Sequence, residues 1–179
     1  NPTLMKNARI TDYKAFAHEI LQAIPDRPIS FEVFSDEFSG MERQSPEIQT
    51  WGENFYVKIP VSNTRQEMAY DLFAWLPGAL VHLNLTAILI LEQVQNVADA
   101  LKDGPDSIVS VFAGRIADTG LDPVPVMQEA LTLLKVAPKA ELLWASPREV
   151  LNIYQADNIG CHIITATNDL IRKLALGGK

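Results

Sequence analysis

The residue in this sequence that is best placed for chemistry is Lys58, which lies inside the apolar run Phe55–Val61. A lysine in a strand that is covered on both faces loses its hydration, and a buried ammonium without a partner is costly. Desolvation lowers the pKa of a lysine from its reference value of about 10.4, which frees the amine to attack a carbonyl carbon. The alternative is a lysine near a strand end that extends to water or pairs with Glu32. The residues expected around Lys58 decide between these two hypotheses.

Polar side chains on the neighbouring predicted strands favour the reactive lysine. Successive side chains of a strand point to opposite faces, so residues at every second position share a face. Four polar residues are predicted to share the face of Lys58: Glu32, Asn84, Thr86 and Ser110. Together with Lys58 they come from four strands, and the sequence therefore predicts a catalytic lysine in a polar setting.

Two arginines follow later strands and predict an anion site. Arg115 comes just past a strand end, and Arg148 lies where the next helix is expected to begin. Two guanidinium groups beside a helix N-terminus bind phosphate well. Two unrelated surface arginines are the alternative, but the loops after the penultimate strands of a barrel commonly bind phosphate. A reactive lysine and a phosphate site together predict a Schiff base to a ketose phosphate.

The composition narrows the class of protein. The 179 residues include 15 basic and 22 acidic ones, giving a formal net charge of −7, and 47% are hydrophobic. This apolar content is enough for a packed core and argues against disorder. An acidic chain without a cluster of basic residues is poorly suited to bind nucleic acid or an anionic membrane.

Cysteine and histidine indicate neither a disulfide framework nor a metal site. The only cysteine in the sequence is Cys161, which excludes an intrachain disulfide and a four-thiolate zinc site and predicts a reducing, cytoplasmic setting. His18, His82 and His162 do not pair with cysteine or acidic residues at the spacing of metal ligands. We therefore predict no metal and no cofactor.

Residues 72–91 carry no formal charge, so this stretch has to be considered as a membrane span. Pro77-Gly78 lies within it, and His82, Asn84 and Thr86 follow at alternate positions. These features together favour the end of a helix, a turn and a buried strand over a spanning helix. The N-terminal residues form a mixed amphipathic stretch, so we expect no signal peptide.

The elements that position the polar residues alternate between strands and helices, which predicts a parallel sheet with crossover connections. Six β-rich runs recur at intervals of 20 to 35 residues: Ile29–Phe34, Phe55–Val61, Val81–Leu89, Ile108–Phe112, Glu141–Ala145 and Cys161–Thr165. Helices are predicted from Thr11 through Ile24, from Thr64 to Trp75, and over Glu92–Leu101, Pro125–Val136, Pro147–Asp157 and Asn168–Leu176.

The strand pattern predicts a barrel rather than an open sheet. Strands buried on both faces normally read as continuous apolar runs, yet Val57 and Ile59 alternate with Tyr56 and Lys58. An open doubly wound sheet gives no reason for a polar second face, whereas in a closed barrel that face lines the interior near the active-site mouth. The predicted fold class is therefore α/β, with the strands in a closed barrel and the helices outside it.

Six motifs resemble the transaldolase family in their order and spacing. They are Asn1-Pro2-Thr3-Leu4, Phe31-Glu32-Val33, Val57-Lys58-Ile59-Pro60, Leu83-Asn84-Leu85-Thr86, Ser110 to Ile116, and Ala145-Ser146-Pro147-Arg148. The similarity is greatest to the small bacterial and archaeal branch, which includes fructose-6-phosphate aldolase, and it covers essentially the whole chain.

The resemblance implies a (β/α)8 barrel and a metal-free Schiff-base mechanism. Lys58 matches the imine-forming lysine of the family, and Glu32 and Thr86 match the pair that holds a catalytic water for proton transfer. The implied substrate-binding residues are Asn1, Asn84 and Ser110 for the hydroxyls, Arg115, Ser146 and Arg148 for the phosphate, and Phe112.

The family reaction moves a dihydroxyacetone unit between sugar phosphates. In the pentose phosphate pathway, sedoheptulose 7-phosphate and glyceraldehyde 3-phosphate give erythrose 4-phosphate and fructose 6-phosphate. Glu32 stands where aldolase-type members resemble one another in having glutamine, and Phe112 where they have tyrosine. A carboxylate gives the water a stronger acid/base partner, which favours transaldolase. Fructose-6-phosphate aldolase and a non-catalytic barrel that binds sugar phosphates are the alternatives.

The extent of the chain differs from the family pattern. Asn1-Pro2-Thr3 matches residues that follow the second strand of the family. The first two strands of the family, the first of which carries an acid/base aspartate, are therefore expected to be missing. The last helix of the family is expected to be missing as well, because the chain stops at Gly177-Gly178-Lys179. About six βα units of a barrel of roughly 240 residues would form a single domain over 1–179, incomplete at both ends. We expect a fragment of a longer protein, or a second chain that supplies the missing units. We also expect a homo-oligomer.

Overall fold

Six parallel strands form one sheet, and their order in space follows their order in the chain. The computed structural model describes residues 9–76 and 81–177, so Asn1 lies outside the described residues. The strands are β1 (Ile29–Glu32), β2 (Phe55–Pro60), β3 (Leu83–Ile88), β4 (Ser107–Val111), β5 (Ala140–Trp144) and β6 (Ile163–Ile164). The predicted α/β class and parallel pairing are therefore confirmed.

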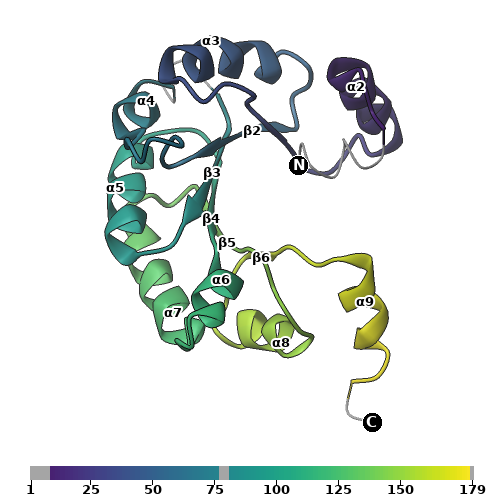
Figure 1. Ribbon diagram of the computed structural model, residues 1–179, viewed down its shortest axis with the longest axis vertical. Helices are drawn as coiled ribbons and strands as arrows, with labels where there is room; N and C mark the ends of the chain where they lie inside the picture. Colours follow the sequence, from purple (N-terminus) through teal and green to yellow (C-terminus); the bar gives the residue numbers. More distant parts are fainter. Residues whose placement is uncertain (1–8, 77–80, 178–179) are drawn as a thin grey trace.

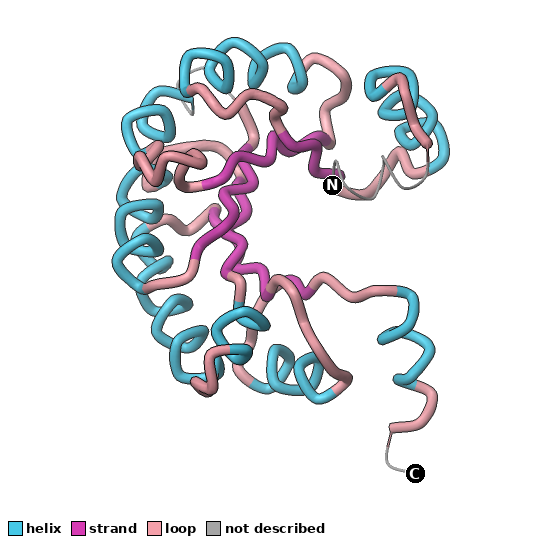
Figure 2. Tube along the Cα trace, in the orientation of Figure 1, coloured by secondary structure: helices cyan, strands magenta, loops and turns pink. Residues whose placement is uncertain are grey.

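Helices connect the strands and cover the outer side of the sheet. They are α2 (Tyr13–Ala23), α3 (Phe38–Gln49), α4 (Tyr70–Trp75), α5 (Leu91–Leu101), α6 (Ala113–Asp118), α7 (Pro123–Leu133), the 3-10 turn η2 (Leu134–Val136), α8 (Leu151–Asn158) and α9 (Asn168–Leu174). Figure 1 shows the sheet curled inside this layer, with α2 and α9 at the two ends of the curve. The strands line the inner side in Figure 2, so the fold has the shape of a half barrel.

The two faces of the sheet differ as the alternation predicts. Phe55, Val57 and Ile59 of β2 are fully buried in the main apolar core, whereas Tyr56 and Lys58 between them are partly buried on the opposite face. Tyr56 packs with a smaller apolar cluster, whose buried members are Ile108, Leu143 and Ala145. One face therefore packs against the helices, and the other faces the interior of the curve.

Helix α4 begins later than the sequence pattern predicts. The expected start was Thr64, but the helix begins at Tyr70. The Thr64 backbone N–H and hydroxyl both donate to the Asp36 carboxylate, over 2.9 and 2.5 Å. Gln66 has a left-handed φ of 65°, which a helix does not allow. Side-chain hydrogen bonds therefore stabilise a turn in place of the first helical residues.

Two helices are missing from the sequence-based prediction. Helix α3 contains Gly40 and Pro46, which disfavour a helix, yet it packs Met41 and Ile48 into the core. Gly40 is required because a Cβ there would lie 2.0 Å from the Ser35 hydroxyl oxygen. Helix α6 has six residues, too few to give a periodic pattern. Tertiary packing determines both helices.

The uncharged stretch that was considered as a membrane span contains the end of α4 and strand β3. Across residues 9–76 and 81–177, no helix has both the length and the hydropathy that crossing a bilayer requires.

Candidate functional site

Lys58 lies near the end of β2, between two polar residues on the neighbouring strands. Its Cα is the register partner of Glu32 on β1 and of Asn84 on β3. Side chains at matching positions of a parallel sheet share a face, so the three side chains line the inner face in one row. The ion pair considered between Lys58 and Glu32 is not formed, since no nitrogen–oxygen contact within 4.0 Å joins them.

Asn84 joins three strands through a buried hydrogen-bond relay. Its Nδ2 donates to the Ser30 Oγ over 2.9 Å, and the Ser110 Oγ donates to its Oδ1 over 2.7 Å. Asn84 is 4% exposed and Ser110 is 2% exposed. Each end of the amide keeps one further hydrogen-bonding position, because Nδ2 has two hydrogens and Oδ1 two lone pairs. The relay fixes the amide beside Lys58 and leaves it able to bind a ligand hydroxyl.

Thr86 has a buried hydroxyl group that needs a partner. Its side chain is 3% exposed, and its Oγ1 makes no hydrogen bond in the part of the chain that the structure describes. The β3–β4 register shifts between Leu85 and Ile88, where Ala87 adopts a left-handed φ of 63°. Irregularities of this kind redirect side chains near active sites. Since a buried polar group is costly without a partner, a water or substrate hydroxyl fits here.

Tyr13 supports Glu32 from outside the sheet, a role that sequence reasoning missed. The Glu32 backbone N–H donates to the Tyr13 hydroxyl over 3.1 Å, and that hydroxyl lies 3.4 Å from the Glu32 carbonyl oxygen, to which it donates. Burial raises the pKa of Tyr13 to about 12. The ring packs edge-on against Phe31. Helix α2 thus holds the edge strand β1 at the residue proposed for proton transfer.

Arg115 and Arg148 are both anchored to helix α6. The Arg115 guanidinium carbon lies 4.8 Å from the centroid of the Phe112 ring, a cation–π contact. The Arg148 Nε donates to Asp118 Oδ1 over 3.1 Å, and its Nη2 donates to Asp118 Oδ2. Both arginines are exposed. The structure therefore brings the two predicted phosphate ligands to one short helix, but one of them already has a carboxylate partner.

Gly114 and Ser146 bring the two arginine motifs into contact. A Cβ on Gly114 would lie 1.6 Å from the Ser146 carbonyl oxygen, so only glycine permits this approach. The Gly114 N–H donates to the Ala145 carbonyl over 3.2 Å, and Ser146 has a left-handed φ of 59°. A non-glycine residue in this conformation is held there by its surroundings. The loop after β5 is therefore fixed against α6.

The helix N-terminus that was expected to help bind phosphate begins elsewhere. The prediction placed it at Pro147, but α8 begins at Leu151. The backbone N–H groups of Arg148 and Glu149 both donate to the Asn152 Oδ1, over 2.8 and 3.2 Å. The Asn152 side chain thus accepts hydrogen bonds from the backbone N–H groups that such a helix end would donate to an anion. The predicted start of this helix is therefore wrong, and sequence reasoning missed Asn152.

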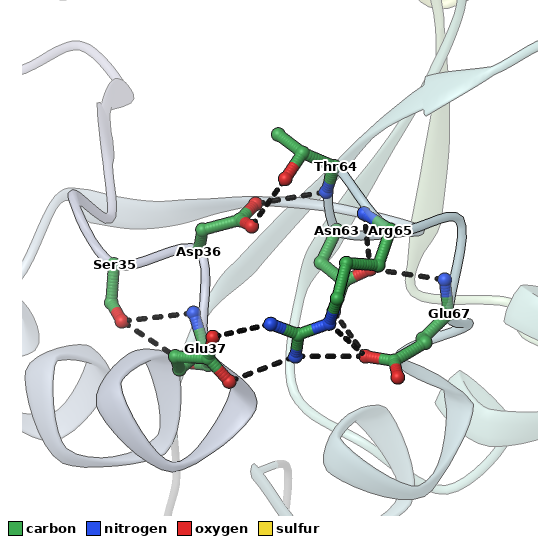
Figure 3. A network of polar contacts seen from close by, with 7 residues as sticks. All are labelled: Ser35, Asp36, Glu37, Asn63, Thr64, Arg65 and Glu67. Atoms are coloured by element: carbon green, nitrogen blue, oxygen red, sulfur yellow. Dashed lines mark hydrogen bonds and ion pairs between the residues drawn. The ribbon is translucent and has the colours of Figure 1, made fainter.

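A network of charged residues ties the loops that follow β1 and β2, as Figure 3 shows. The Arg65 Nη1 and Nη2 donate to the two carboxylate oxygens of Glu37 over 2.6 and 2.9 Å, and its Nε donates to Glu67 over 3.1 Å. Hydrogen bonds from Arg65 lower the pKa of Glu37, and those from Thr64 lower the pKa of Asp36. Asp36 is partly exposed and Glu37 is exposed, and both carboxylates have hydrogen-bond partners in this network.

No group of three or more histidine, cysteine or acidic side chains is arranged to hold a metal ion within residues 9–76 and 81–177. The residues that gather on the inner face are an amine, a carboxylate, an amide and hydroxyls. These groups can form a covalent bond to a carbonyl carbon, transfer protons through a water and bind hydroxyl groups.

Comparison with known proteins gives a match over the whole chain. Residues 1–179 match the family model described as transaldolase/fructose-6-phosphate aldolase. The chain is 27% identical to a probable transaldolase of Dehalococcoides mccartyi over 175 residues, which cover 97% of this chain and 77% of that protein. Over 177 residues it is 28% identical to a probable transaldolase of Thermoplasma acidophilum, covering 97% and 75%. A probable transaldolase of Roseiflexus castenholzii is 33% identical over 166 residues, covering 92% and 72%.

Proposed function

This chain belongs to the transaldolase/fructose-6-phosphate aldolase family, and we propose that it is a transaldolase that acts through a Schiff base on Lys58. The proposed reaction moves a dihydroxyacetone unit from sedoheptulose 7-phosphate to glyceraldehyde 3-phosphate, giving erythrose 4-phosphate and fructose 6-phosphate in the pentose phosphate pathway. The observation that carries the proposal is the row of Glu32, Lys58 and Asn84 at one register level of the inner face.

Lys58 is the proposed nucleophile. Its amine adds to the C2 carbonyl of the ketose phosphate, and loss of water from the carbinolamine gives an iminium ion. The iminium withdraws the electron pair of the C3–C4 bond while the C4 hydroxyl gives its proton to the acid/base aspartate that the resemblance to the family implies, so the C3–C4 bond breaks, an aldose phosphate leaves and an enamine stays on Lys58. The enamine carbon then attacks the aldehyde of the acceptor, which forms the new C3–C4 bond, and the aspartate returns the proton to the new C4 hydroxyl. Addition of water to the regenerated iminium releases the product ketose and the free amine.

Glu32 and Thr86 are the proposed holders of the water that transfers protons in the first and last steps. The carboxylate of Glu32 can accept or return a proton, and the Thr86 hydroxyl can fix the water oxygen. The buried Thr86 Oγ1 without a hydrogen-bond partner among the described residues supports this assignment. Such a water would satisfy the hydroxyl, and it would lie on the face that carries the lysine.

The remaining residues are proposed to bind the sugar phosphate. Asn84 and Ser110 bind hydroxyls of the dihydroxyacetone unit, supported by the hydrogen-bonding positions that their relay leaves open. Phe112 bounds the site beneath the Arg115 guanidinium. The proposed ligands of the phosphate are Arg115, Ser146 and Arg148. Asn1 is also proposed to bind substrate hydroxyls, although it lies outside the described residues.

The six strands are proposed to be part of a (β/α)8 barrel, to which residues 1–179 contribute as a single domain. Strands β1 and β6 are the edges of the sheet, and two further parallel strands between them would close the curve. We further propose a cytoplasmic homo-oligomer that uses no metal or cofactor. Light scattering on the purified protein tests the oligomeric state.

A product assay tests the reaction. Purified protein is incubated with fructose 6-phosphate, with and without erythrose 4-phosphate as acceptor. A transaldolase forms sedoheptulose 7-phosphate only when the acceptor is present and releases little free dihydroxyacetone. Rapid release of dihydroxyacetone without acceptor would instead identify a fructose-6-phosphate aldolase, the second candidate. Binding of fructose 6-phosphate without either product would indicate a non-catalytic barrel.

A further inference from the structure

Asp118 contacts only one edge of the Arg148 guanidinium group. The contacts run from Nε to Oδ1 over 3.1 Å and from Nη2 to Oδ2. A guanidinium has five N–H donors in a plane, and this side-on pairing uses one on Nε and one on Nη2. The other terminal nitrogen, Nη1, makes no hydrogen bond to any residue that the structure describes. The end-on edge formed by Nη1 and Nη2 is therefore available for a second bidentate acceptor such as phosphate.

Both partners of this ion pair are fixed to the protein on their backbone side. Asp118 ends helix α6, whose Gly114 meets the Ser146 carbonyl oxygen and donates to Ala145. The Arg148 backbone N–H donates to the buried Asn152. The pair thus bridges two rigidly placed segments. Arg115, the other proposed ligand of the phosphate, lies on the turn of α6 that precedes Asp118.

We propose that Asp118 is a positioning residue of the phosphate site, which holds Arg148 so that its end-on edge binds the phosphate of the substrate. This inference rests on the proposed function. A long exposed side chain loses rotamer freedom when it binds an anion, and a side chain that is already oriented loses less. The carboxylate binds the adjacent side-on edge, and solvent screens its repulsion of the anion because both side chains are about half exposed.

The first test titrates inorganic phosphate into the purified protein and follows the arginine Nε–H resonances by NMR. Asp118→Asn keeps the shape of the side chain but loses the charge and one acceptor. We expect it to shift the Arg148 Nε–H resonance and to weaken phosphate binding about 3- to 10-fold, the effect of losing one charge-assisted hydrogen bond. The matched control is Asp157→Asn, which removes an exposed carboxylate on α8 with no side-chain partner among the described residues.

The second test separates positioning from a structural effect. For the reaction with fructose 6-phosphate, Asp118→Asn should raise KM by a similar factor and leave kcat nearly unchanged, and the reaction with unphosphorylated fructose should not change. In an Arg148→Ala background, Asp118→Asn should have no further effect on phosphate binding, because Asp118 acts through Arg148.

An unchanged or tighter phosphate affinity in Asp118→Asn would overturn the inference, since the carboxylate would then be idle or would compete with the anion. Failure of the wild-type protein to bind phosphate would overturn it too. The proposed function fails separately, if borohydride does not trap fructose 6-phosphate on Lys58. A protein that binds phosphate in an Asp118-dependent way without such trapping would keep the inference and lose the transaldolase mechanism.

Discussion

Glu32 and Lys58 are register partners on neighbouring parallel strands, and their side chains share the inner face of the curled sheet without forming an ion pair. A direct ion pair would hold the amine in its charged form and block its attack on a carbonyl. The observed arrangement places the carboxylate and the amine on the same face at matching register positions and leaves the two groups separate. A water molecule can then carry the proton between them.

Replacing Glu32 with glutamine tests the role of the carboxylate, since the shape of the side chain is kept. We expect Glu32→Gln to lower kcat for the transfer reaction by about 10²- to 10⁴-fold, because the water loses its acid/base partner. Release of free dihydroxyacetone should increase relative to transfer, since glutamine is the residue of the aldolase-type members. Steady-state assays with and without acceptor measure both. Glu19→Gln, which alters an exposed residue of α2, is the control. A kcat equal to that of the wild type would remove Glu32 from the mechanism.

The buried hydrogen-bond relay through Asn84 predicts that removing Asn84 destabilises the protein more than removing the Ser30 hydroxyl. Asn84→Ala leaves the 2% exposed Ser110 hydroxyl without its acceptor, so the free energy of unfolding should fall by about 1–3 kcal/mol. Ser30→Ala removes a partner that is only partly buried, and should cost about 1 kcal/mol or less. Urea denaturation followed by circular dichroism measures both values. Equal losses in the two variants would contradict the importance of the relay.

The contact between Gly114 and Ser146 predicts that a single added methyl group disrupts the packing of the loop after β5 against α6. Gly114→Ala places a Cβ 1.6 Å from a backbone oxygen, and we expect a loss of about 3 kcal/mol or more because a backbone carbonyl cannot turn aside. Gly120→Ala meets no atom within 4 Å and suffers only from its φ of 88°, so it should cost about 1–2 kcal/mol. Thermal melts compare the two. A Gly114→Ala protein as stable as Gly120→Ala would show that the loop can move away.

The buried Tyr13 phenol should make the stability of the folded protein depend on pH in the alkaline range. Burial raises the pKa of Tyr13 in the folded protein from 10.0 to about 12. A pKa that is higher in the folded state contributes stability that is complete below pH 10 and disappears as the pH rises through about 12. Wild-type protein should therefore lose stability over that range more steeply than Tyr13→Phe, which cannot ionise there. Melting temperatures from pH 8 to pH 12 measure the difference. Parallel curves would mean that the phenol is not held against β1.

The strands and the inner-face residues could be predicted because a strand has a period of two. The alternation around Lys58 determined which side chains share its face, and the register of β1, β2 and β3 agrees with it. Partners across the fold could not be predicted in this way. The pairing of Arg148 with Asp118 depends on where the short helix α6 lies, and no local pattern encodes that.

Local competition explains the errors in the predicted helices. Helical propensity favours a start at Pro147. The backbone N–H groups of Arg148 and Glu149 donate to the Asn152 side chain instead, and α8 begins only at Leu151. The same kind of competition, through Asp36, shortens α4 at its beginning. In α3 the balance is reversed, because burial of Met41 and Ile48 compensates for an unfavourable sequence.

Covalent trapping with borohydride shows whether the Lys58 amine forms a Schiff base with the substrate. Purified protein is mixed with fructose 6-phosphate, reduced with borohydride and digested, and the peptides are mapped by mass spectrometry. We expect one reduced dihydroxyacetone or hexose adduct, on the peptide that contains Lys58, and its loss in Lys58→Arg. Absence of any adduct in the wild-type protein, or an adduct on another lysine that survives in Lys58→Arg, would exclude Lys58 as the nucleophile.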